Sequence, residues 1–249
     1  MGRHKNSIPA AGAPMFEELD YRPSPIGTLS LRRRRLSKDG EDIYEIKLDD
    51  GYLMSSHFTA GEIALAQQAL EHFGTGPVDV VIGGLGLGYT AKAALDCANV
   101  QRLVIVEAIP EVVEWHQRHL VPLGRELSER STFVIGDFFA MAAADGSFEP
   151  GRQYRRYDAI LVDIDHSPAH LLDPSNAAFY EVDGLSAMAE KLKAGGVFAL
   201  WSTDRPDPDF LARLRAVFPD GAARIVEFEN RYQDLPAVNT IYTGRKPAR

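Results

Sequence analysis

The sequence predicts an α/β protein in which a mainly parallel sheet is covered by helices on both faces, and two observations support this class. From residue 78 onward, short uninterrupted apolar runs alternate with helical stretches, a pattern typical of buried parallel strands. The last two apolar runs, 224–228 and 239–244, are joined by a loop too short to hold a crossover helix, so this final pair should be antiparallel.

The first 58 residues differ from this pattern. Residues 1–15 lack periodicity and are rich in proline, glycine and alanine, so we expect a flexible tail. Residues 16–58 predict a small antiparallel β element of two or three strands. Its strand-like runs are 28–36, 43–48 and 52–55, and its turn signals are Lys38-Asp39-Gly40 and Asp50-Gly51. The basic run 32–35 favours a solvated edge strand over an anion patch, because successive side chains point to opposite faces.

Residues 59–249 form the predicted main domain. Residues 59–73 predict a helix that opens with a capping-box-like spacing of Thr59 and Glu62. The expected strands are 78–82, 102–106, 132–135, 159–162 and 197–201, with helices beginning near Tyr89 and Pro110. His116 and His119, in the second of these helices, are expected on its outer face.

Composition limits the classes of function. The 249 residues include 27 Lys and Arg against 35 Asp and Glu, a net charge of −8, which argues against a nucleic-acid partner because phosphate binding requires a basic face. The single cysteine, Cys97, excludes an internal disulfide framework and fits a cytoplasmic location. No apolar run approaches the roughly 18 residues of a membrane span, so no membrane partner is expected.

A glycine-dense turn follows the first strand of the main domain. Gly84, Gly86 and Gly88 lie between the strand 78–82 and the helix that begins near Tyr89. Glycines allow backbone N–H groups and a helix N-terminus to approach a ligand closely. A tight strand-to-helix connection also requires glycine when nothing binds, so the turn alone leaves both interpretations open.

Two acidic residues end the next two strands. Glu107 follows the glycines by about 20 residues, where a carboxylate can accept hydrogen bonds from both ribose hydroxyls. It could instead cap the helix at Pro110. Asp137 is placed to accept from the exocyclic amine of a purine, or to serve as the N-cap of the helix that follows it.

The strand 159–162 delivers Asp163, Asp165 and His166 to the edge where open α/β sheets bind ligands. Asp163 and Asp165 are the candidate catalytic residues, as proton acceptors or as groups that orient an acceptor, although both could be helix caps or solvent-facing carboxylates. His166 and His170 are four residues apart, but Ser167-Pro168 between them argues against a regular helix, so no metal site is predicted.

These elements, in this order, resemble class I S-adenosylmethionine-dependent transferases and, more narrowly, the spermidine synthase family. The resemblance covers roughly residues 28 to 218 and is carried by Val81-Ile82-Gly83-Gly84, Val106-Glu107, Gly136-Asp137, Tyr157-Asp158 and Val162-Asp163. It implies a Rossmann-like, seven-stranded class I methyltransferase sheet of order 3-2-1-4-5-7-6 and a possible homodimer. It also implies that S-adenosylmethionine, or its decarboxylated form, binds at Gly84, Gly86, Gly88, Glu107 and Asp137.

Three departures from the family pattern concern the substrate. The aspartate of the family's Gly-Gly-Gly-Asp-Gly-Gly turn, which holds the amine of the decarboxylated nucleoside, falls on Gly86. Its Asp-x-x-Asp pair matches Asp163 and then His166, with Asp165 as a shifted substitute. Its Tyr-His-Glu motif is present only through Glu62, which with His166 is assigned to substrate binding. A buried ammonium without a carboxylate is costly, so these losses argue against an unchanged diamine substrate.

The leading hypothesis is therefore methyl transfer from S-adenosylmethionine to a small acceptor, for which an amine is one candidate. This reaction requires alignment and at most one proton acceptor. The first alternative is an aminopropyltransferase of polyamine synthesis that uses decarboxylated S-adenosylmethionine. The second is a nucleoside-binding protein without catalytic activity, in which Asp163 and Asp165 serve only structure. A dinucleotide dehydrogenase is disfavoured, because the three glycines lack the spacing of its fingerprint.

Overall fold

The computed structural model describes residues 15–24, 27–35, 40–230 and 235–248. The chain divides into two compact units with the boundary between His57 and Phe58. The expected tail residues 1–14 and the predicted turn residues Lys38 and Asp39 lie outside the described residues.

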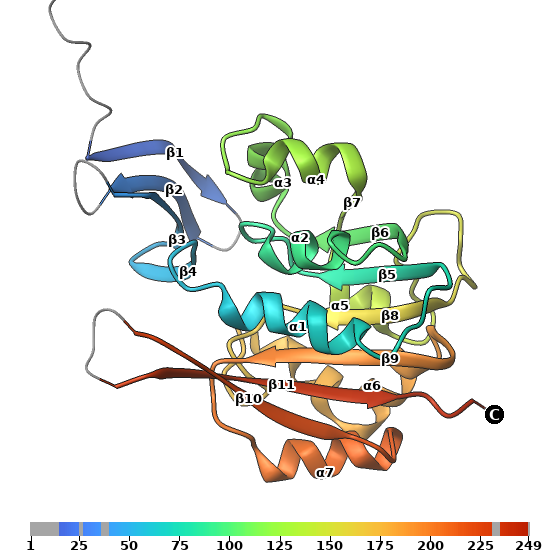
Figure 1. The fold of residues 1–249 in the computed structure, drawn as a ribbon. Coiled ribbons are helices and arrows are strands. Elements are labelled where there is room, and N and C mark those ends of the chain that lie inside the picture. Colours follow the sequence, from blue (N-terminus) through green and yellow to red (C-terminus); the bar gives the residue numbers. More distant parts are fainter. Residues whose placement is uncertain (1–14, 25–26, 36–39, 231–234, 249) are drawn as a thin grey trace, which may run out of the picture. The chain divides into compact units, whose positions relative to one another are not determined.

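The first unit contains a four-stranded antiparallel sheet of order β1-β2-β3-β4 (Figure 1). Its strands are β1 Phe16–Ser24, β2 Gly27–Arg35, β3 Asp42–Leu48 and β4 Gly51–Ser55. The prediction of two or three strands missed β1, which consists of exposed and half-buried residues without a buried one. A strand that buries no side chain lacks the apolar alternation from which a strand is recognised.

The basic run Arg32–Arg35 lies on an interior strand, so the prediction of an edge strand was wrong. β2 pairs with β1 on one side and β3 on the other. Carboxylates on both neighbouring strands pair with the guanidinium groups; for example, Arg34 Nε lies 2.7 Å from Glu45 Oε1, and Arg33 contacts Glu17. The carboxylates of the neighbouring strands thus balance the arginine charges that solvent would have screened on an edge strand.

The second unit contains a seven-stranded sheet of order β10-β11-β9-β8-β5-β6-β7. Its strands are β5 Val78–Gly83, β6 Val100–Glu107, β7 Thr132–Ile135, β8 Tyr157–Val162, β9 Leu192–Ser202, β10 Ala222–Phe228 and β11 Ala237–Arg245. Numbered along the chain and read from β7, this order is the predicted 3-2-1-4-5-7-6. β11 is antiparallel to both β9 and β10, which confirms the antiparallel final pair.

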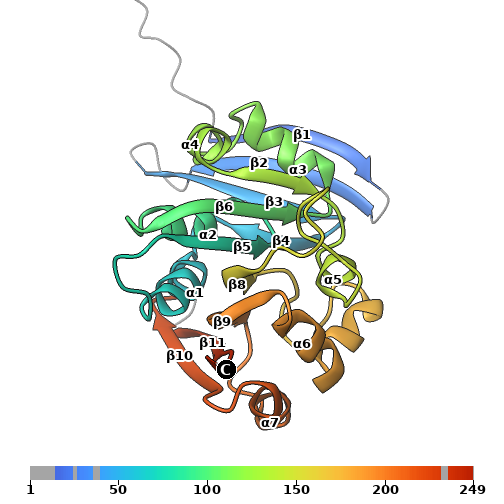
Figure 2. The ribbon, with the colours of Figure 1, turned by 90° about the vertical axis from the view of Figure 1, so that its right-hand side faces the viewer.

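Helices cover both faces of this sheet, with α1 on one face and α5 and α6 on the other (Figure 2). The helices are α1 Ala60–Leu70, α2 Tyr89–Leu95, α3 Pro110–Gln117, α4 Gly124–Arg130, α5 Phe138–Ala142, α6 Val182–Ala189 and α7 Pro208–Val217, with the 3-10 helix η1 Pro174–Tyr180. A cluster of buried aromatic rings, including Phe138, Phe179, Phe198 and Phe210, contributes to the core of this unit. None of the helices in the described part of the chain has the length and apolar character that a membrane span requires.

The capping box expected at the start of α1 is not formed. Thr59 occupies the N-cap position, but its side chain makes no capping hydrogen bond. Glu62 is only 8% exposed and interacts electrostatically with Asp163 instead of closing back on the helix terminus. The spacing of Thr59 and Glu62 is that of a capping box, but Glu62 is buried near Asp163 at the carboxyl end of β8 instead.

Candidate active site

The predicted site residues meet at one edge of the large sheet. Strands β8, β5, β6 and β7 are neighbours and parallel, so their carboxyl ends lie side by side. These ends are followed by Asp163, by the turn 84–88, by the terminal Glu107 and by Asp137, respectively. The topology therefore brings the four predicted motifs to the edge where ligands bind in sheets of this kind.

The turn 84–88 adopts a backbone that requires glycine. Gly84, Gly86 and Gly88 have φ angles of 92°, 48° and 91°. A Cβ on Gly84 would lie 2.0 Å from the carbonyl oxygen of Asp163, and one on Gly88 would lie 2.3 Å from Leu127 Cδ1. The glycines therefore let the backbone of the turn approach neighbouring groups closely.

The carboxylate of Glu107 joins the glycine turn to the start of α3. Oε2 accepts a hydrogen bond of 2.9 Å from Leu85 N, and Oε1 accepts one of 2.9 Å from Ile109 N. Burial raises the pKa of Glu107, while these backbone N–H groups oppose that shift. The carboxylate is therefore held in place by the backbone N–H groups of the turn and of the start of α3.

Asp137 is the N-cap of α5, the second of the two interpretations that the sequence left open. Its Oδ1 accepts hydrogen bonds from Phe139 N at 2.9 Å and Ala140 N at 3.3 Å. The side chain is exposed at the end of β7. Since one oxygen makes both capping bonds, a cap and a contact to a ligand through Oδ2 are compatible.

Glu62, Thr90 and Asp163 form the acidic centre of the edge. Thr90 Oγ1 donates a hydrogen bond of 2.6 Å to Asp163 Oδ2. Burial raises the pKa of Asp163 to about 6, although the Thr90 hydroxyl opposes the shift. Burial, and then the charge of Asp163, raise the pKa of Glu62 to about 8. Near neutral pH the two carboxyl groups therefore share one proton and carry one negative charge between them.

Asp165 points into the loop that follows β8. It is 2% exposed, and it accepts hydrogen bonds from Leu172 N at 2.7 Å and from Tyr180 Oη at 2.7 Å. Asn176 Nδ2 adds contacts of 3.4 and 3.3 Å to its two oxygens. These donors occupy both carboxylate oxygens, so the structure places Asp165 apart from the Glu62 and Asp163 pair.

His166 is half-buried next to Asp165, and its backbone carbonyl accepts hydrogen bonds from Thr203 N at 2.7 Å and Thr203 Oγ1 at 3.0 Å. His170 turns toward Asp204, whose Oδ2 lies 2.9 Å from His170 Nδ1. Within the described ranges, no group of three histidine, cysteine or acidic side chains is arranged to hold a metal ion.

Two residues near this edge were not assigned from the sequence. Thr90 lies in the first turn of α2, directly after the glycine turn, and its hydroxyl was the only sequence feature that suggested a hydrogen-bonding role. His116 was expected on the outer face of α3, which was wrong, because it is 0% exposed and its Nε2 lies 2.9 Å from the carbonyl oxygen of Gly86. The amphipathic pattern of α3 could not show that α4 packs against it from the other side.

Trp201 also lies at this edge, at the end of β9. Its Nε1 is buried without a hydrogen-bond partner among the described residues. A Cβ on Gly61 would lie 2.4 Å from that nitrogen and 2.3 Å from Asn239 Oδ1. The start of α1 therefore fits against a wall made by β9 and β11, next to Glu62.

Comparison with known proteins identifies the fold. No family model matches the chain. The chain superimposes on spermidine synthase from Thermotoga maritima with a TM-score of 0.67 and 18% sequence identity, over 93% of this chain and 73% of that one. The chain has a spermidine synthase-like fold.

Two curated relatives resemble this spermidine synthase-like chain in sequence. Polyamine aminopropyltransferase 2 of Pseudomonas aeruginosa is 30% identical over 152 residues, which are 57% of this chain and 40% of that protein. Putrescine N-methyltransferase 2 of Nicotiana attenuata is 28% identical over 148 residues, 57% of this chain and 37% of that protein. The chain thus matches less than half the length of either relative.

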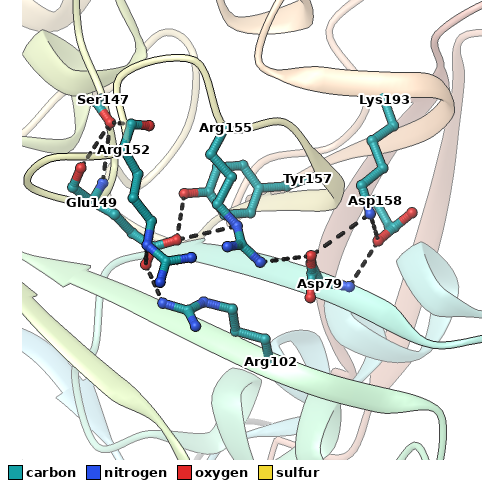
Figure 3. Close-up of polar contacts among 9 residues, drawn as sticks. All are labelled: Asp79, Arg102, Ser147, Glu149, Arg152, Arg155, Tyr157, Asp158 and Lys193. Carbon is teal, nitrogen blue, oxygen red and sulfur yellow. Dashed lines mark hydrogen bonds and ion pairs between the residues drawn. The ribbon is translucent and has the colours of Figure 1, made fainter.

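An ion-pair network lies at the amino ends of the strands in the spermidine synthase-like sheet (Figure 3). Glu149 is 5% exposed and contacts Arg102, Arg155 and the hydroxyl of Tyr157, the last at 2.9 Å. A cavity of about 330 Å³ beside it is lined by Asp145, Ser147, Glu149, Pro150, Gly151 and Gln153. These groups lie at the amino ends of the strands, away from the acidic centre, and they tie the loop before β8 to β6.

Proposed function

We propose that this chain is an S-adenosylmethionine-dependent transferase that moves a methyl group to a small, amine-bearing acceptor. The observation that carries the proposal is the pair of Glu62 and Asp163, which lies beside a nucleoside-type glycine turn and shares one proton at neutral pH. The two curated relatives are named for transfers to polyamines and to putrescine, which supports an amine as the acceptor.

The residues of the edge fit the nucleoside. The turn 84–88 packs so closely against Asp163 and Leu127 that only glycine fits at positions 84 and 88, and its backbone N–H groups are proposed to face the ligand. Glu107 lies at the end of β6, where its carboxylate is proposed to accept hydrogen bonds from the two ribose hydroxyls. Asp137 stands at the end of the next strand, where Oδ2 would accept from the amine of the base.

When bound, S-adenosylmethionine supplies an electrophilic methyl carbon, and its sulfur takes the electron pair of the broken S–C bond. The negatively charged pair attracts the ammonium form of the acceptor, and Asp163 accepts one proton from it. The lone pair that this leaves on the nitrogen then forms the new N–C bond. The proton that Glu62 and Asp163 share leaves the pair with one negative charge, which matches one ammonium group. Thr90 orients the carboxylate of Asp163.

Asp165 and His166 take supporting roles in this proposal. Asp165 holds the loop between β8 and η1 through Leu172 and Tyr180, and the loop forms one side of the acceptor site. His166, half-buried next to Asp165, is proposed to contact the acceptor. This division leaves Asp163 as the proton acceptor.

Aminopropyl transfer is the second candidate, favoured by the 30% identity to a polyamine aminopropyltransferase. Against it stands Gly86, which occupies the place where the resemblance expects an aspartate for the amine of the decarboxylated nucleoside. A cation bound there would lack its carboxylate partner.

The test is calorimetric binding of S-adenosylmethionine and of its decarboxylated form, followed by transfer assays with amines that begin with putrescine. Tighter binding of the carboxylated form with N-methylation supports the proposal, and a preference for the decarboxylated form favours aminopropyl transfer. Binding without transfer to any acceptor supports a non-catalytic protein, and no binding of either form refutes all three. Glu107→Gln should weaken binding, whereas Glu114→Gln, in α3 and paired with Arg118, is the control and should not.

We also propose a cytoplasmic location and a homodimer. The single cysteine, half-buried Cys97, suits a reducing compartment, and the dimer follows from the resemblance to spermidine synthases. Cell fractionation and light scattering of the purified chain test these two points.

A further inference from the structure

His116 connects α3 to the middle of the glycine turn. Its imidazole is 0% exposed, and Nε2 lies 2.9 Å from the carbonyl oxygen of Gly86. A carbonyl oxygen can only accept, so Nε2 carries the proton and donates. The other ring nitrogen, Nδ1, is buried without a hydrogen-bond partner in the described part of the chain.

Packing fixes the imidazole where it stands. A Cβ on Gly88 would lie 3.1 Å from His116 Cε1, so the ring contacts the end of the turn as well as its middle. The imidazole of His116 also meets the ring of Phe133 edge-on, with the two ring centroids 6.0 Å apart. On the backbone side, a Cβ on Gly124 would lie 2.6 Å from the carbonyl oxygen of His116, so α4 starts directly against this residue.

His116 and Glu107 both connect the glycine turn to α3 through hydrogen bonds. Glu107 holds Leu85 N through one oxygen and Ile109 N through the other. Ile109 is the N-cap of α3, and α3 returns to the turn through His116 and Gly86. Glu107 thus links the first half of the turn to the start of α3, and His116 links the middle of the turn to the body of the same helix.

The imidazole is neutral under ordinary conditions. Burial lowers the pKa of His116 to about 4, while its hydrogen bond to Gly86 acts in the opposite direction. A second ring proton would sit on Nδ1, which faces no acceptor. The neutral Nε2–H tautomer is therefore the form that meets the carbonyl of Gly86.

We propose that His116 is a positioning residue for the nucleoside, because its hydrogen bond to Gly86 holds the glycine turn in the conformation that receives the ligand. The inference rests on the proposed function for the identity of the ligand. It adds a residue outside the family-like motifs, on the helix whose first residues are already bound to Glu107.

The experiment compares His116→Phe, which keeps a ring without the donor, with His116→Gln, whose amide N–H can take the place of Nε2–H. Val112→Ala, a truncation of a buried residue on the same helix, is the control for lost stability. Affinity for S-adenosylhomocysteine is measured by calorimetry well below the melting temperature of each variant. We expect affinity to fall about tenfold in His116→Phe, to stay within about threefold of wild type in His116→Gln, and to be unchanged in Val112→Ala.

Hydrogen exchange of the amides of residues 84–88 is the second measurement, and it needs no ligand. Faster exchange there in His116→Phe than in Val112→Ala supports the inference, and equal exchange overturns it. Wild-type affinity in His116→Phe, or an equal loss in Val112→Ala, also overturns it. If the wild-type protein bound no nucleoside, the proposed function and the ligand role of His116 would both fail, while the exchange data would still decide whether His116 holds the turn.

Discussion

The hydroxyl of Thr90 donates a hydrogen bond of 2.6 Å to Oδ2 of Asp163, and this bond ties the first turn of α2 to the carboxyl end of β8. The same hydroxyl lies 3.3 Å from the carbonyl oxygen of Glu62. One hydroxyl hydrogen serves one acceptor well, and the shorter contact to a charged oxygen is the stronger. Thr90 therefore stabilises the ionised form of Asp163 against the effect of burial.

Replacement of Thr90 by valine should raise the pKa of Asp163 above its value of about 6, because the variant keeps the shape of threonine but removes the donor. In a pH profile of kcat/KM, the ascending limb should move to higher pH and the rate at pH 7 should fall several-fold. Thr90→Ser keeps the hydroxyl and should keep the limb in place. A limb at the same pH in Thr90→Val would show that Asp163 does not control it.

Asp163→Asn should lower kcat about 100-fold or more, because an amide cannot accept the proton of the attacking amine. Affinity for the nucleoside should stay within about threefold of wild type, since Glu107 and the glycine turn are untouched. Asp158→Asn is the matched control, because Asp158 lies at the other end of the same strand and pairs with Lys193. Equal loss of kcat in both variants would contradict a chemical role for Asp163.

Stability should depend on pH through Glu62. Its folded-state pKa of about 8 exceeds the model-peptide value of 4.5, so the unfolded state loses its proton first as pH rises. The stability contribution is complete below the unfolded value and is lost as pH rises from 4.5 to about 8. Glu62→Gln removes this titration, so its melting temperature relative to wild type should rise between about pH 5 and pH 9.

Calorimetric melting across that range measures the difference between Glu62→Gln and wild type. Glu71→Gln, at the exposed end of the same helix, is the control, and its difference from wild type should stay flat. A constant difference for Glu62→Gln as well would refute the burial of a titrating carboxyl at this position.

The fold and the outline of the site follow from the sequence because both depend on local patterns. Buried parallel strands such as β5 and β8 are continuous apolar runs, and a polar residue that ends such a strand is carried to one edge by topology alone. Strand β1 could not be predicted in this way, because it buries no side chain and so has no apolar pattern.

The side-chain environments could not be predicted in the same way. Asp163 and Asp165 are two residues apart and chemically identical, yet one faces Thr90 and the other faces Tyr180. Which direction each takes depends on a loop that closes over Asp165 from residues 172 to 180. His116 is a similar case, because its burial depends on the packing of α4 against α3.

Asp165→Asn should separate positioning from chemistry. An asparagine offers one acceptor oxygen to donors that now reach two, so the loop anchored by Leu172 and Tyr180 should loosen. We expect a lower melting temperature and a raised KM for the acceptor, with kcat reduced only a few-fold. Tyr180→Phe, which removes one of the donors, should show the same trend more weakly. A loss of kcat as large as that of Asp163→Asn would instead place Asp165 in the chemistry.

The network at the amino ends of the strands should stabilise the unit without affecting the site (Figure 3). Glu149 contacts Arg102, Arg155 and Tyr157 from a buried position, so Glu149→Gln leaves partly buried guanidinium groups short of a carboxylate. We expect the free energy of unfolding to fall by about 2 kcal/mol, less than for a fully buried pair because the arginine side chains are 31% and 24% exposed. Chemical denaturation measures this change. Affinity for the nucleoside should not change, because Glu149 stands at the edge opposite to Glu107; a weakened affinity in the folded variant would mean that the two edges are coupled.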